Sequence, residues 1–151
     1  MSTATKSIAS VLNSLIETCK DGQEGFRSAA ENVKGSDFKA LFGELSMQRQ
    51  QFAAELQRLV RDLGEEAEKG GDLGGALHRG WMDLKAAITG GDEHAMLAEC
   101  ERGEDVAVAE YRDALDHDEL PANVLGVIRQ QSVAVQAAHD RVRDLRDRFQ
   151  S

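Results

Sequence analysis

Carboxylates and one histidine occur at positions of this sequence where the buried side chains of long helices are expected. A di-iron or di-manganese carboxylate site takes a Glu from each of two helices and a Glu-x-x-His pair from each of the other two. Glu24 and Glu104 match the two single carboxylates. Glu44–Met47 has the Glu but lacks the His, and Gln136–His139 has the His but lacks the Glu. Each pair is therefore half present.

The four matching side chains, Glu24, Glu44, Glu104 and His139, predict a degenerate metal site. Three carboxylates and one imidazole can hold one divalent ion but are too few for two. Iron or manganese is the expected ion if this site binds a metal. The preferred expectation is that the protein has no cofactor.

A second interpretation is that polar side chains at the middle of the predicted helices form a structural layer rather than a metal site. Gln48 and Arg49 fall where an apolar side chain is expected, and Gln131 alone interrupts the last apolar stripe. Tyr111 is expected in the core, with its hydroxyl paired to a carboxylate. Polar side chains that hydrogen-bond one another inside a bundle fix the register of its helices. The preferred interpretation is therefore a polar layer of Gln48, Arg49, Gln131 and Tyr111.

Four long helices and one short helix are predicted to position these residues. Apolar residues recur at steps of three and four along residues 5–33, 37–67, 93–115 and 121–149, as in helices with one buried stripe. Glycine-rich segments border a short helix predicted over residues 76–88, which carries Trp81 and His78.

The lengths of the connections predict the topology. Short turns join the first two long helices and the last two, so each pair is an antiparallel hairpin. The segment between the hairpins can run the length of a bundle at about 1.5 Å per helical residue. We therefore predict an all-α, ferritin-like up-down-down-up four-helix bundle. It forms one domain over residues 1–151, with a long crossover that contains the short helix.

The composition limits the classes of partner. A chain of 151 residues, with 41% hydrophobic and 30% charged residues, is typical of one folded domain. A net charge of -9 disfavours nucleic acid and anionic membranes, and no apolar run reaches the ~20 residues that span a bilayer. Cys19 and Cys100 lie in helical patterns and are expected as buried thiols of a reducing compartment. With the polar start of the chain, these features predict a cytoplasmic protein.

Several segments carry a resemblance to a known family. They are Leu77–Ile88, Gly90–Gly91, Glu99–Asp105 and Tyr111–Leu115. Together they resemble an uncharacterised family of proteobacterial ferritin-like proteins that is classed as a domain of unknown function. The resemblance implies a ferritin-like bundle in a bacterial cytoplasm, and it implies no reaction. The wider ferritin-like superfamily suggests iron or oxygen chemistry, but Met47 and Gln136 depart from its ligand pattern.

The preferred function is that of a structural or interaction protein with a degenerate metal site. Such a protein is expected to form a homo-oligomer or to bind a protein partner, and an enzyme is the less favoured interpretation. The alternative is an iron- or manganese-binding bundle with weak oxidoreductase or metal-handling activity. A histidine phosphotransfer bundle is disfavoured, because His139 is followed by Asp140 and arginines rather than by a lysine and a small residue.

Overall fold

The computed structural model describes residues 3–67 and 93–150, which form four helices and no strand. The helices are α1 (Thr3–Asn32), α2 (Ser36–Asp62), α5 (Glu93–Leu115) and α6 (Ala122–Gln150). The prediction of an all-α helical bundle is confirmed. The short helix predicted over 76–88, with Trp81 and His78, lies outside the described residues.

Glycines mark both ends of α2. Gly35 is its N-cap, with an extended backbone at φ -80° and ψ 136°. Gly64 has a φ of 79°, a left-handed conformation that glycine adopts without the steric cost of a Cβ. The structure therefore ends α2 at Asp62, before the predicted end at residue 67.

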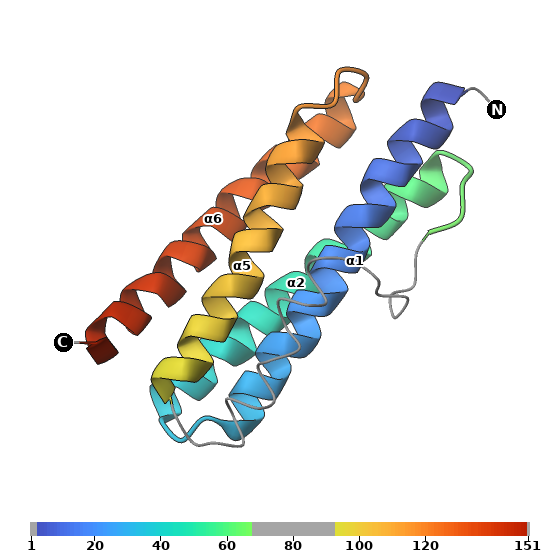
Figure 1. The fold of residues 1–151 in the computed structure, drawn as a ribbon. Helices are drawn as coiled ribbons and strands as arrows, with labels where there is room; N and C mark the ends of the chain where they lie inside the picture. The colour runs from blue at the N-terminus through green and yellow to red at the C-terminus, as the bar shows by residue number, and fades with distance from the viewer. Residues whose placement is uncertain (1–2, 68–92, 151) are drawn as a thin grey trace.

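The helices form two neighbouring hairpins, α1 with α2 and α5 with α6 (Figure 1). The hairpins meet mainly where α1 packs against α5, and α2 touches α6 only sparsely. α2 and α5 both begin at the end of the bundle where α1 ends, and they run in the same direction (Figure 1). Each helix therefore brings its middle to the same level of the bundle.

The apolar core is divided into two clusters along the bundle. One cluster contains Leu12, Leu56 and Ile128 and lies toward the N-terminal end of α1. The other contains Phe26, Phe42 and other side chains near the α1–α2 turn, where these two rings stack with centroids 6.0 Å apart. On α1, α2 and α5 the boundary between the clusters falls at Gly22, Arg49 and Glu104, respectively. A layer that contains the polar side chains of Arg49 and Glu104 thus separates the two apolar clusters near the middle of the bundle.

None of the helices in the described ranges combines the length and the apolar character needed to cross a membrane.

Candidate functional site

An ion pair between Arg49 of α2 and Glu104 of α5 lies at the boundary between the two apolar clusters. Nη1 of Arg49 donates to Oε1 of Glu104 at 2.7 Å, and Nη2 donates to Oε2 at 2.6 Å. The Arg49 and Glu104 side chains are 1% and 0% exposed. Burial of two charges costs free energy that only close geometry and further hydrogen bonds offset, and this two-point pairing is the strong form. Both carboxylate oxygens of Glu104 are therefore engaged by a guanidinium.

α1 provides the space that the guanidinium occupies. A Cβ at Gly22 would lie 3.1 Å from Nη1 and 3.4 Å from Cγ of Arg49. One turn along α1, the Phe26 ring centroid lies 5.4 Å from Cζ of Arg49, where the face of an aromatic ring attracts a cation. Gly22 therefore leaves room for the side chain of Arg49, and Phe26 contacts its guanidinium.

A second set of hydrogen bonds links all four helices beside the ion pair. The hydroxyl of Tyr111 donates to Oε1 of Gln131 at 2.7 Å and lies 3.1 Å from Sγ of Cys19. Nε2 of Gln131 in turn donates to Oε1 of Glu55 at 2.8 Å. These contacts fix the register of α6 and α1 relative to α5, because a shift by one turn separates every pair.

The buried groups around the ion pair are held in their ordinary protonation states. Burial raises the pKa of the Cys19 thiol to about 11, although the hydrogen bond with Tyr111 acts in the opposite direction. Burial also raises the pKa of Cys100 and that of Tyr111. Burial alone lowers the pKa of Arg49, but the Glu104 carboxylate outweighs it and raises that pKa. Neither thiol is thus a reactive thiolate near neutral pH, and Arg49 stays charged.

The structure places the predicted polar-layer residues around this centre. Arg49, Tyr111 and Gln131 are buried, and Gln48 is half-buried, with its Oε1 accepting from Nε of Arg49 at 3.4 Å. The hydroxyl of Tyr111 bonds an amide oxygen rather than the predicted carboxylate. The reason is that Arg49 already engages both oxygens of Glu104.

The structure does not bring together the four residues predicted as metal ligands. Glu24 is exposed and pairs with Arg27 on its own helix, because it lies between the inward-facing positions of α1. Glu44 is also exposed, and its nearest ion-pair partner is Arg141 at 4.0 Å. Of the three predicted carboxylates, Glu104 alone is buried.

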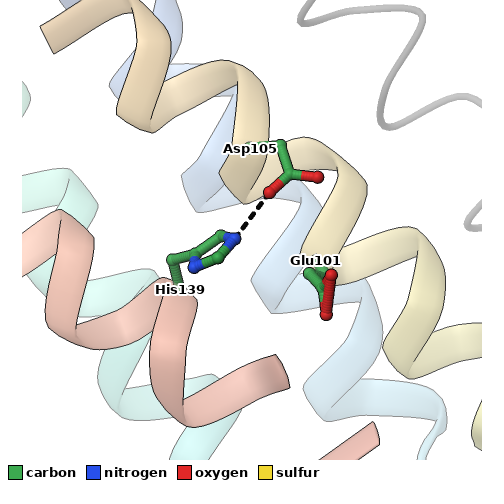
Figure 2. A group of neighbouring side chains, drawn as sticks. All are labelled: Glu101, Asp105 and His139. Atoms are coloured by element: carbon green, nitrogen blue, oxygen red, sulfur yellow. Dashed lines mark hydrogen bonds and ion pairs between the residues drawn. The ribbon is translucent and has the colours of Figure 1, made fainter. Parts of the chain in front are cut away.

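His139 lies in a different group of ligand-type side chains, between α5 and α6 near the surface (Figure 2). Its Nε2 is 2.5 Å from Oδ1 of Asp105, and its Nδ1 is 3.1 Å from Oδ1 of Asp140. Glu101 lies one turn before Asp105 on α5. One ligand atom from each of Glu101, Asp105 and His139 lies within 4.8 Å of the others. We call these three residues the α5–α6 cluster.

Neighbouring charges shape the α5–α6 cluster. Burial alone lowers the pKa of His139, but hydrogen bonds with Asp140 and Asp105 outweigh it and raise that pKa. Oε1 of Glu101 accepts from Nη1 of Arg146 at 2.7 Å. Oε2 of Glu101 is shielded from solvent and has no hydrogen-bond partner among the described residues. The cluster therefore offers an imidazole and two carboxylates, one of which has an unused oxygen.

The sequence analysis did not single out Glu101 or Asp105 as candidate ligands. Their spacing of four residues places both on one face of a helix, and this spacing was the available signal. Their proximity to His139 depends on how α6 is set against α5, which periodicity alone does not give. Cys19 and Glu55 were also missed as members of the central network.

The model of one protein family, described as a domain of unknown function (DUF2383), matches residues 7–117. The chain belongs to this family. The predicted membership of a family classed as a domain of unknown function is confirmed. The DUF2383 match includes Arg49, Glu104 and Tyr111, whereas His139 lies beyond it. A search of curated proteins finds no match to the chain.

Proposed function

We propose that this DUF2383 protein is a ferritin-like up-down-down-up bundle whose centre holds an arginine instead of metal ions. In this proposal it is a structural or interaction protein of a bacterial cytoplasm rather than an enzyme. The observation that carries the proposal is the fully buried, two-point ion pair between Arg49 and Glu104. The common direction of α2 and α5 supports the ferritin-like topology (Figure 1).

The ion pair explains why the bundle centre is unsuited to a metal. A ferritin-like site gathers inward-facing carboxylates from four helices and neutralises them with cations. Here the guanidinium of Arg49 already neutralises Glu104, while Glu24 and Glu44 lie on the surface. A metal ion that displaced Arg49 would leave a buried cation unpaired, at a cost of about 3–5 kcal/mol. Among the described residues, the bundle centre therefore offers no set of free carboxylates for the alternative of an iron or manganese oxidoreductase.

The sparse contact between α2 and α6 supports an interaction role. A groove of about 570 Å³ lies along this seam. Its lining combines three apolar side chains, the exposed Met47, the half-buried Phe52 and Ala134, with four glutamine amides and the carboxylates of Glu44 and Glu55. Methionine adapts its shape to a contacting surface. We propose that this groove contacts a protein partner, either a second copy of the chain or another protein.

Metal content tests the first part of the proposal. The chain is purified without a metal-affinity tag, and iron and manganese are measured by mass spectrometry in the wild type, Glu104→Gln and the surface control Glu24→Gln. We expect far less than one iron or manganese ion per chain in all three proteins. Stoichiometric iron or manganese that disappears only in Glu104→Gln would contradict the proposal.

Size-exclusion chromatography with light scattering tests the interaction role. We expect the wild type to associate with itself or with a protein recovered from lysate, and Met47→Glu to lose that association. Gln50→Glu, which changes an α2 residue outside the groove, is the matched control. A wild-type chain that stays strictly monomeric and recovers no partner would overturn this part.

A further inference from the structure

We propose that Glu101, Asp105 and His139 bind one divalent transition-metal ion, of the zinc class, that ties α5 to α6. The three side chains come from two helices and lie close together, with Asp105 and His139 pointing toward one another (Figure 2). The site is separate from the Arg49–Glu104 pair. The inference goes beyond the proposed function and does not rest on it.

The donor set selects the class of ion. Calcium and magnesium take oxygen ligands, whereas imidazole nitrogen favours zinc and similar first-row ions. Zinc accepts histidine nitrogen and carboxylate oxygen at about 2.0–2.2 Å, which puts tetrahedral ligands roughly 3.4 Å apart. The ligand atoms here lie within 4.8 Å of one another, so rotations of the side chains suffice to reach that spacing. Three protein ligands leave the fourth position to water.

The orientation of His139 suits a ligand that coordinates through Nε2. Oδ1 of Asp140 lies 3.1 Å from Nδ1, while Nε2 is on the side of Asp105 (Figure 2). A carboxylate that holds one ring nitrogen of a metal-binding histidine is a recurrent arrangement, because it fixes the tautomer and the ring plane. Asp140 is itself held by Arg143 at 3.3 Å.

Glu101 provides an observation that is independent of the histidine. Its side chain is 13% exposed, and Oε1 is fixed by Arg146. Its Oε2 is shielded from solvent without a hydrogen-bond partner among the described residues. A buried polar atom without a partner is uncommon and is accounted for by a bound ion or water. Coordination by Oε2 satisfies this atom without breaking the contact to Arg146.

The present partners of the cluster can give way to a metal at little cost. Asp105 is 59% exposed, and exposed ion pairs contribute little to stability. Arg143 contacts Asp140 and Arg146 contacts Glu101, so these two arginines offset part of the negative charge around the cluster. Glu104 differs, because the cation that neutralises it is the buried side chain of Arg49.

Zinc titration with residue-specific detection tests the inference. Tag-free protein is stripped with a chelator, dialysed and titrated with ZnCl₂ by calorimetry, while histidine nitrogen resonances are followed by NMR. We expect about one zinc ion per chain and a shift of the Nε2 resonance of His139. Asp105→Asn and His139→Gln should each weaken binding by about tenfold or more.

A matched histidine variant controls for binding elsewhere. His117 contacts Ser7 across the bundle at 3.0 Å, and His117→Gln should leave zinc binding unchanged. Unaltered zinc affinity in both Asp105→Asn and His139→Gln, or no Nε2 shift at His139, overturns the inference. Asp105→Asn changes an exposed side chain, so the test remains decisive if His139→Gln fails to fold.

Discussion

Glu104 and Asp105 are neighbours on α5, yet their carboxylates are in opposite surroundings. Glu104 is 0% exposed and bound at both oxygens by Arg49, whereas Asp105 is 59% exposed and contacts His139. Breaking the contact between Arg49 and Glu104 costs much free energy, because it leaves a buried charge without its partner. Breaking the contact between His139 and Asp105 costs little, because water can solvate the exposed carboxylate. The availability of a carboxylate to a metal thus depends on its existing partner as much as on its position.

The largest expected effect comes from breaking the central pair. Arg49→Met leaves the Glu104 carboxylate buried without its partner, and we expect a loss of about 3–5 kcal/mol in the free energy of unfolding. The double variant Arg49→Met/Glu104→Leu removes both charges and should recover most of that loss. Urea unfolding of the three proteins measures these differences. A double variant less stable than Arg49→Met would show that the ion pair is not the source of the effect.

Asp21 is a second buried carboxylate, but unlike Glu104 it lies beside another carboxylate rather than an arginine. Burial, helped by Glu17, raises its pKa to about 7. Its folded-state pKa thus exceeds the unfolded value of about 4, so the folded protein binds this proton more tightly. The resulting stability is complete below about pH 4 and is lost as the pH rises to about 7.

Asp21→Asn should therefore flatten the decline in stability between these pH values by about 2 kcal/mol, after allowance for solvent screening. Urea unfolding at a series of pH values measures the slope, with the exposed Asp62→Asn as the control. Equal slopes in the wild type and Asp21→Asn would mean that Asp21 titrates normally.

Gly22 tests whether α1 is shaped for the guanidinium. Alanine in place of a helical glycine usually adds about 1 kcal/mol of stability, but a Cβ at Gly22 meets Nη1 of Arg49 at 3.1 Å. We expect Gly22→Ala to destabilise by about 1 kcal/mol and to become stabilising when Arg49→Met is also present. Gly43→Ala, where a Cβ meets nothing within 4 Å, should be stabilising in both backgrounds. Thermal unfolding of these variants decides the sign.

The smallest effect is expected on the surface. Glu24 pairs with Arg27, and both side chains are more than half exposed. Glu24→Gln should leave the urea midpoint unchanged within error, because exposed pairs of this kind contribute little. A clear drop in the midpoint would show that Glu24 has a structural role that its exposure conceals.

The all-α fold could be predicted because spacing of apolar residues reports directly on buried helix faces. The polar residues Arg49 and Gln131 were visible as interruptions of those faces. Which polar side chains meet was not predictable, because the spacing of apolar residues gives the buried face of each helix but not how far each helix is shifted along its neighbours. Glu24 is two residues from Gly22, and that offset rotates it to the surface. The contact between Asp105 and His139 likewise requires the register of α5 against α6, which only the packed structure provides.

Anomalous diffraction from crystals soaked in manganese shows whether arginine or a metal ion neutralises Glu104. We expect the guanidinium of Arg49 to stay on both oxygens of Glu104, with no anomalous peak at coordinating distance from that carboxylate. A manganese peak bound to Glu104, with Arg49 displaced, would contradict it.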